Sequence, residues 1–304
     1  MKHQYIKALV QVADSGSIWA AARALNISQS ALTRSMKELE EDVSAELLNR
    51  SYRGVTFTDA GKALLARARL ILSTIERARD EVRQISGGAG AKVALGITPV
   101  VATTVFPNIY RRFIAEFPEA LLTLKEGFMT EIVPGVLAGD LDFGVAIATR
   151  DQLPSELVFT PLSNTRLLVA GREGHRLAHS QDWVELAGAR WILNLTNGST
   201  GHHLLYWLEK QGLPHPSNIV QCTSPTLMME MMRRTDLIGI GPDRLIGDPM
   251  SSCGVVPFDI SPALPSATMG LFKLRGVPLT PAAQRIETWI KRAITADHMA
   301  SISG

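Results

Sequence analysis

Residues 16–43 read GSIWAAARALNISQSALTRSMKELEEDV. Gly16 follows an apolar-periodic segment and is placed to end a helix, and Ser17 is placed to cap the next, a short alanine-rich helix. After a turn at Asn26-Ile27, Ser28 is placed to cap a longer helix. This stretch predicts two helices joined by a tight turn, the arrangement of a helix-turn-helix.

The longer helix has two unlike faces. Its apolar residues recur at steps of four, three and four, which commits one side to the core: Leu32, Met36, Leu39 and Val43. On an isolated helix, a polar opposite side is most often only a solvated face. Behind a tight turn, however, side chains that bond base edges and phosphates favour insertion into the major groove of DNA. The candidate DNA contacts of this segment are Ser28, Gln29, Ser30, Thr33, Arg34 and Lys37.

Two short strands joined by a basic turn are predicted next, over residues 49–58. Such a β-wing would present Arg50 and Arg53 to the phosphate backbone and add affinity that does not depend on sequence. A plain surface hairpin is the alternative. Net charge is only +2, with a small basic excess before residue 92, so a DNA-binding function rests on pattern rather than on charge.

Over residues 16–61 the chain resembles the LysR-type transcriptional regulators. The segments that carry the resemblance are residues 16–18, Ala21-Ala22 with Leu25, residues 28–34, Leu39-Glu40, Leu47-Leu48 with Arg50, and residues 58–61. Departures from the family are Ser44 for glycine, Leu48 for phenylalanine and Phe57 for leucine. The resemblance implies binding to promoter DNA through the recognition helix and Arg53, a homotetramer, and contact with RNA polymerase if the protein is an activator.

A long helix is predicted from Asp59, with Thr58 as its cap. Its apolar residues alternate steps of four and three, which is typical of a two-stranded coiled coil: Leu64, Ala68, Ile71, Ile75, Ala78, Val82 and Ile85. The pattern predicts a homodimer through this linker helix; an amphipathic helix lying on its own domain is the alternative. Residues 87–91, GGAGA, are expected to end the helix and form a flexible joint.

From Lys92 onward, strands and helices alternate, which predicts parallel sheets with helices on both faces. The expected strands are 93–97, 121–124, 143–147, 167–170, 191–193, 220–222, 238–240 and 267–272, with a last helix from Thr280-Pro281. Residues 139–144 and 236–242 resemble the effector domain of the same family, itself similar to type II periplasmic solute-binding proteins. The resemblance implies two Rossmann-like α/β subdomains with a ligand between them. The expected fold is therefore mixed: a helix-rich winged domain at 1–58, a linker helix and hinge at 59–91, effector subdomain I at 92–162 plus 267–304, and subdomain II at 163–266.

Three turns are candidates for the effector site, because ligands of α/β sheets lie at strand carboxyl ends beside helix N-termini. They fall at residues 98–100, 196–203 and 223–225, and the resemblance places the effector at the first. Their hydroxyl and N–H groups suit an organic or aromatic acid, although any one turn can be a simple helix cap. The turn after the second strand, at residues 128–130, is expected to line the same cleft. The candidate effector residues are therefore Thr98, Pro99, Val100, Phe128, Met129, Thr130, Thr200, Gly201, His202, His203, Thr223 and Ser224. Met228, Met229, Met231 and Met232 are interpreted as soft core or pocket wall.

Other function classes find little support. Nucleophile-elbow, phosphate-loop, zinc-protease and dinucleotide motifs are all missing, which disfavours an enzyme, and no cofactor is expected. Adjacent His202 and His203 point apart on a helix, so no metal site is expected either. No export signal or membrane span is recognisable, so a cytoplasmic protein with no membrane partner is predicted. Cys222 and Cys253 cannot form a disulfide framework; a redox-sensing regulator stays open as the alternative, as does, more remotely, a solute-binding protein.

Overall fold

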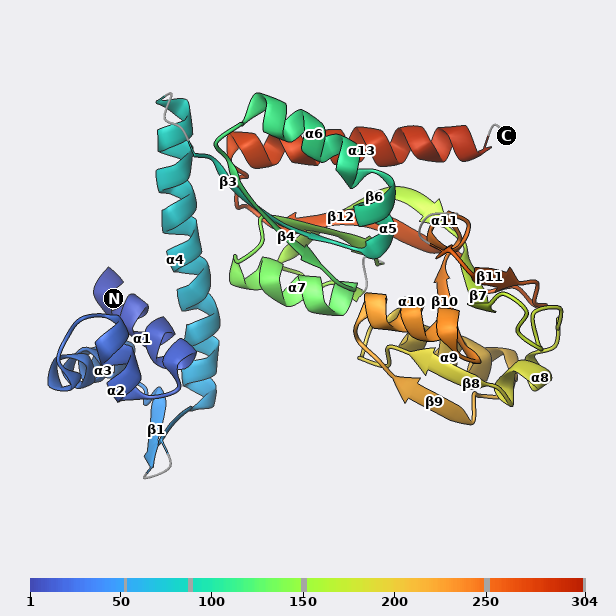
Figure 1. Cartoon of the computed structure of the whole chain (residues 1–304). Helices are drawn as coiled ribbons and strands as arrows, with labels where there is room; N and C mark the ends of the chain where they lie inside the picture. The colour runs from blue at the N-terminus through green and yellow to red at the C-terminus, as the bar shows by residue number, and fades with distance from the viewer. Residues whose placement is uncertain (52–53, 87–89, 149–151, 249–251, 303–304) are drawn as a thin grey trace. The chain divides into compact units, whose positions relative to one another are not determined.

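The computed structural model describes residues 1–51, 54–86, 90–148, 152–248 and 252–302. The chain divides into two compact units, one formed by residues 1–86 with 137–140 and the other by 87–136 with 141–304 (Figure 1). Among the described residues, every helix is too short or too polar to cross a membrane.

Helices with a small hairpin build the N-terminal unit. Its elements are α1 (His3–Ser15), α2 (Ile18–Ala24), α3 (Gln29–Val43), β1 (Leu48–Ser51), β2 (Gly54–Phe57) and α4 (Asp59–Ile85). The predicted caps are confirmed: Ser17 Oγ accepts the N–H of Ala20, and Ser28 Oγ accepts the N–H of Ala31. Gly16 ends α1 in the left-handed region, with φ of 68°. The two helices of the turn therefore start and stop where local chemistry places them.

The core of this unit joins all three short helices to the start of the hairpin. Leu9 of α1 and Leu32, Met36 and Leu39 of α3 have no exposed surface. The hairpin is fixed by Glu40, whose Oε1 accepts the backbone N–H groups of Leu47 at 2.8 Å and Leu48 at 3.1 Å. The apolar face predicted for the longer helix is thus the core face.

The apolar stripe of α4 divides into two parts. Ala68 is fully buried, and Leu64 and Ile71 pack against the core of the N-terminal unit. Further along, Val82 is 64% exposed and Ile85 74% exposed. The first part of the predicted coiled-coil stripe therefore packs partly on its own domain, and its pairing with a second copy stays a prediction. The second part is left open to a partner.

Two five-stranded sheets form the second unit, in the orders β4-β3-β5-β12-β6 and β11-β7-β10-β8-β9. The strands of the first are β3 (Lys92–Ile97), β4 (Leu121–Glu126), β5 (Phe143–Ile147), β6 (Leu157–Thr165) and β12 (Ala267–Leu274); those of the second are β7 (Leu167–Arg172), β8 (Arg190–Leu193), β9 (Asn218–Gln221), β10 (Leu237–Pro242) and β11 (Val255–Phe258). The two sheets confirm the predicted α/β class.

Strand direction corrects one prediction. Pairing is parallel for β3 with β4 and β5, and for β8 with β9 and β10. It is antiparallel for β12 with β5 and β6, and for β7 with β10 and β11. The chain passes from the first sheet to the second directly from β6 to β7 and returns directly from β11 to β12. Strands β7 and β12 therefore do not follow the crossover helix that parallel pairing needs. Each sheet is consequently mixed, and β6 and β11 were not predicted.

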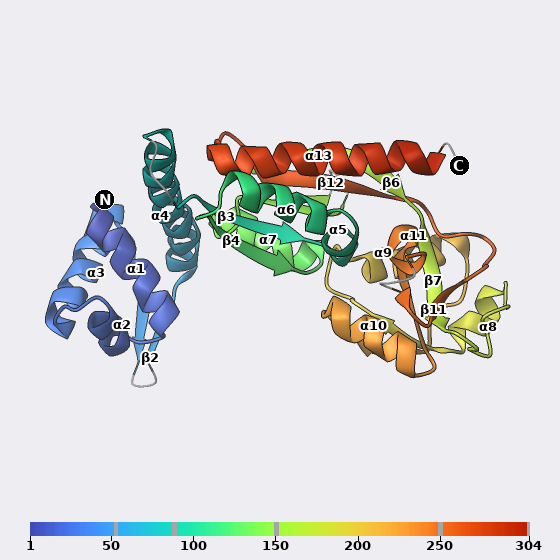
Figure 2. The ribbon, with the colours of Figure 1, turned by 45° about the horizontal axis from the view of Figure 1, so that its top comes forward.

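Helices cover the sheets on their faces. The first sheet carries α5 (Pro99–Thr104), α6 (Phe106–Glu116), α7 (Met129–Ala138) and α13 (Pro281–Ile302); the second carries α8 (Trp183–Ala187), α9 (Thr200–Gln211), α10 (Pro225–Arg234) and α11 (Asp243–Ile246). Figure 2 shows α13 running along the first sheet beside α6, where Ile286 and Ile290 join its core. The single helix expected before Pro118 is two helices, since α6 restarts at Phe106-Pro107 with proline in its first turn.

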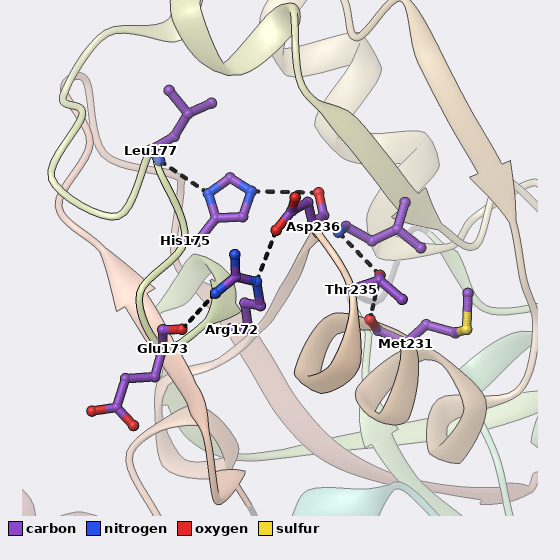
Figure 3. Close-up of polar contacts among 8 residues, drawn as sticks. Arg172, Glu173, His175, Leu177, Met231, Thr235 and Asp236 are labelled. Carbon is purple, nitrogen blue, oxygen red and sulfur yellow. Dashed lines mark hydrogen bonds and ion pairs between the residues drawn. The ribbon is translucent and has the colours of Figure 1, made fainter.

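A polar cluster fixes the start of β10 against the end of β7 (Figure 3). Arg172 Nε lies 2.8 Å from Asp236 Oδ1. The buried ring of His175 accepts the N–H of Leu177 at Nδ1, and its Nε2 lies 3.4 Å from the carbonyl oxygen of Asp236. Burial lowers the pKa of His175. Because Nδ1 is an acceptor, the ring fits this position in its neutral form.

Candidate effector cleft and recognition helix

One cavity of about 310 Å³ in the second unit is lined by segments of both sheets. Strand ends and helix N-termini contribute to it from β3, β4, α5, α7, α9 and α10, with further walls from β10 and α11. The predicted effector residues that line it are Thr98, Pro99, Val100, Phe128, Met129, Thr130 and Thr200. The structure thus brings residues from three distant parts of the sequence to one cleft.

Thr98 is a polar residue of the cleft wall and stands directly before α5. Its carbonyl oxygen accepts the N–H groups of Val101 and Ala102, both at 3.0 Å, so the backbone starts α5. The side chain does not cap the helix. Only 5% of Thr98 is exposed, and its Oγ1 has no hydrogen-bond partner in the described part of the chain. A buried hydroxyl without a partner is unfavourable, and a ligand in the cleft could supply one.

The N-terminus of α9 adds backbone donors. Ser199 Oγ accepts the N–H of His202 at 3.2 Å, and the Ser199 carbonyl accepts that of His203 at 3.0 Å. Among the described residues, the N–H groups of Thr200 and Gly201 have no acceptor, as is usual in a first helical turn. Since Thr200 lines the cleft, an anionic group can be accommodated on this side.

Five predicted effector residues do not line the cleft: Gly201, His202, His203, Thr223 and Ser224. A Cβ at Gly201 would lie 2.3 Å from the carbonyl oxygen of Asn194, so this glycine serves close packing. His203 is exposed on α9, where its ring contacts the Gln152 amide, and partial burial lowers its pKa. Ser224 Oγ is used to cap α10, accepting the N–H of Leu227 at 3.3 Å. At this turn the serine side chain therefore acts as a helix cap, which was the alternative to an effector contact.

Sulfur-containing side chains form much of the apolar wall. Met228, Met229 and Met232 of α10 face the cleft with Met129 of α7, which confirms the interpretation of the methionine run as a pocket wall for those three. Met231 is only partly buried against the same cluster. Thioether side chains adapt to flat or irregular apolar ligands. The shape of the ligand is therefore less constrained here than at the rigid strand ends.

Charged residues at the cleft were missed at the sequence level. Glu126 ends β4 directly beside Ile97, the last residue of β3, so the strand-end rule that selected Thr98 could also have selected it. Glu230 and Arg233 lie on α10, where Arg233 Nε donates to the Cys253 carbonyl at 2.6 Å. Glu230 is paired with Arg233 and Arg234. The two arginines and the glutamate of this cluster together carry one net positive charge.

The candidate DNA contacts lie mostly on one exposed side of α3. Gln29, Ser30, Arg34 and Lys37 are exposed, and Thr33 is half-buried. Ser28 is exposed as well, although its hydroxyl already caps the helix. For the wing, Arg50 lies in β1, and Arg53 lies outside the described residues. The candidate DNA contacts of α3 are therefore accessible together on one side of the helix.

A helix-turn-helix with an exposed polar face and a two-sheet unit with a ligand-sized cleft are the parts of a ligand-responsive DNA-binding protein. The chain belongs to the LysR family. Residues 3–62 match the bacterial regulatory helix-turn-helix protein, lysR family, and residues 86–295 match the LysR substrate binding domain. It is therefore a LysR-type transcriptional regulator with a substrate-binding domain, as the sequence motifs predicted.

Known proteins resemble it along nearly the whole chain. The uncharacterized HTH-type transcriptional regulator YbhD of Escherichia coli is 30% identical, over 94% of this chain and 90% of that protein. The crystal structure of full-length CbnR in complex with its target DNA has a TM-score of 0.64 at 21% identity, covering 96% of this chain and all of that one (100%). The full-length LysG of Corynebacterium glutamicum with the bound effector Arg also has a TM-score of 0.64 at 21% identity, covering 97% and 99%.

Proposed function

We propose that this regulator binds promoter DNA through α3 and the wing, and that a small organic or aromatic acid in the Thr98 cleft controls the response. The proposed division is DNA binding by residues 1–58, pairing through the linker at 59–91, and effector binding by subdomains of residues 92–162 plus 267–304 and 163–266. RNA polymerase is a further partner if the protein is an activator. CbnR binds target DNA, which supports the first part by analogy.

The observation that carries the effector proposal is the buried, partnerless hydroxyl of Thr98 on an apolar cavity wall. Thr200, at the N-terminus of α9, lines the same cavity, and methionines form part of its apolar wall. A carboxylate would accept hydrogen bonds from the hydroxyl and the helix N-terminus, while an apolar body would contact the methionines. LysG is described with an amino acid as its effector, which fits a carboxylate-bearing ligand.

A thermal-shift screen of organic and aromatic acids tests the effector proposal. A ligand at about a hundred times its dissociation constant adds roughly 2.7 kcal/mol to the stability of the folded state, a shift that is readily measured. Footprinting of the bound promoter with and without the acid then shows whether binding alters the DNA contacts. If organic acids produce no shift while uncharged or cationic compounds do, the ligand class is wrong.

The DNA contacts are tested by three alanine variants. Gln29→Ala and Arg34→Ala should each weaken binding to a specific duplex by about 1 to 3 kcal/mol, because they remove base contacts. Arg53→Ala should weaken binding to specific and shuffled DNA alike, as expected of a phosphate contact. Equal losses for all three variants on both duplexes would contradict this division of roles.

We further propose a dimer through the exposed part of α4 and assembly of two dimers into a tetramer. The coiled-coil spacing and the exposure of Val82 and Ile85 support the dimer. Multi-angle light scattering of the full chain measures both states, and a monomer at all concentrations would contradict them.

A redox-sensing regulator is the second candidate. Cys222 is half-buried and donates weakly to the Ser224 carbonyl, and Cys253 is exposed. Thiol labelling before and after peroxide distinguishes the two functions. Loss of both labels together with a change in the DNA footprint would favour redox sensing over an organic effector.

A further inference from the structure

A polar contact links the first helix to the recognition helix. Tyr5 of α1 is 6% exposed, and its hydroxyl donates to Glu38 Oε2 of α3. Lys2 Nζ in turn donates to the Tyr5 oxygen at 3.1 Å. Tyr5 therefore spends its only proton donor on Glu38, and the carboxylate is anchored by a residue of the core.

The second oxygen of this carboxylate holds Arg34. Arg34 Nε donates to Glu38 Oε1 at 3.0 Å, while 82% of the arginine side chain is exposed. Hydrogen bonds from Tyr5 and Arg34 lower the pKa of Glu38, which keeps its carboxylate ionised. Nε is bound to Glu38 and the side chain is largely exposed, so the two terminal nitrogens of the guanidinium are the donors available to a partner. Those two nitrogens can donate end-on to O6 and N7 of a guanine.

Resting on the proposed DNA-binding function, we propose that Tyr5 and Glu38 are positioning residues that orient Arg34 to read a guanine in the major groove. If the Arg34 side chain is already held in one conformation, it loses less conformational entropy when it binds DNA. An exposed pair four residues apart would do this weakly by itself. The anchor on buried Tyr5 is what distinguishes this pair.

Lys37 and Glu41 supply the contrast on the same helix. Their atoms are 3.7 Å apart, and both side chains are largely exposed, at 75% and 65%. Among the described residues, no core side chain anchors Glu41. Glu38→Ala and Glu41→Ala therefore each remove one carboxylate from an ion pair between residues four apart. Only Glu38→Ala also removes a hydrogen bond to a core side chain.

The test uses two probes: a duplex enriched by the wild-type protein from a random-sequence pool, and a shuffled duplex of equal composition. The measured quantity is the ratio of the two affinities in the full-length protein, at several salt concentrations. Tyr5→Phe and Glu38→Ala should each lower the ratio about 3-fold to 10-fold, and neither should alter the salt dependence. Glu41→Ala should leave the ratio unchanged, although removal of either carboxylate strengthens binding to both duplexes.

A double-mutant cycle separates positioning from a general structural role. In an Arg34→Ala background, Tyr5→Phe should have no further effect on the ratio. If its effect persists undiminished, the positioning inference is overturned while the proposed contact of Arg34 stands. If Arg34→Ala itself leaves the ratio unchanged, the proposed base contact fails and the inference falls with it. Circular dichroism checks the fold, and should Tyr5→Phe unfold, the surface variant Glu38→Ala carries the same cycle.

Discussion

The backbone N–H of Thr98 donates to the carbonyl oxygen of Val145 at 3.1 Å. This bond ties the residue after β3 to the neighbouring strand β5 and fixes the backbone that carries the Thr98 side chain. The backbone of Thr98 is therefore held at the edge of the cleft, whereas its hydroxyl has no hydrogen-bond partner in the described part of the chain. Binding can then satisfy a buried polar group without rearranging the strand.

Thr98→Val should abolish most effector binding without loss of stability. Valine has nearly the same shape but cannot donate, so about 1 to 3 kcal/mol of effector affinity should be lost. The thermal midpoint of the ligand-free protein should stay the same or rise slightly. Calorimetry with an acid found by the screen measures the affinity.

Thr103→Val is the matched control, since Thr103 also lines the cleft but donates to the Pro99 carbonyl at 3.0 Å. It should retain most of the effector affinity. Equal loss in the two variants, or none in either, would place the polar contact elsewhere.

Val82→Asp should split the dimer. An aspartate in a coiled-coil seam would bury an unpaired charge, which costs several kcal/mol. Light scattering should show the mass of the assembly halved or lower. Val184→Asp is the control, because Val184 is a valine of almost equal exposure, 65% against 64%. An unchanged mass for Val82→Asp would exclude this part of α4 as the seam.

His175 should make stability fall in mild acid. Burial lowers the pKa of the folded ring below the ordinary value of 6.5, so between the two pKa values the unfolded chain binds more protons. Stability should therefore decrease as the pH falls below about 6.5. His175→Asn keeps an acceptor for the Leu177 N–H and should flatten this dependence. Exposed His179→Asn should not, and identical slopes in wild type and His175→Asn would refute the assignment.

Gly61→Ala should weaken the attachment of α4 to the hairpin. A Cβ at this position would lie 2.1 Å from the carbonyl oxygen of Leu47, and a backbone atom cannot turn aside as a side chain can. Overpacking of this kind costs about 1 to 3 kcal/mol. Chemical denaturation of the full chain measures the loss, and a variant as stable as the wild type would show that the helix start can shift.

Helix boundaries in the N-terminal unit followed from residues close together in the sequence. Ser17, Ser28 and Thr58 each cap a helix through the N–H three residues ahead, so their role is readable without knowledge of the fold. The apolar steps of α3 likewise identify its core face, because helical geometry alone puts those residues on one side.

Tertiary structure decided what the same local signals are used for. Thr98 and Ser224 are both hydroxyl residues before a helix, but Ser224 is used as the cap and Thr98 is left facing a cavity. The α4 stripe has one period throughout, yet Ala68 covers its own domain and Val82 does not. The spacing and type of the residues identify an apolar face of a helix, but only the elements packed nearby determine what covers that face. For that reason the sequence determined the family, the starts of the capped N-terminal helices and most strands, whereas strand direction, the charged residues at the cleft and the Tyr5–Glu38 contact depended on the packing of distant segments.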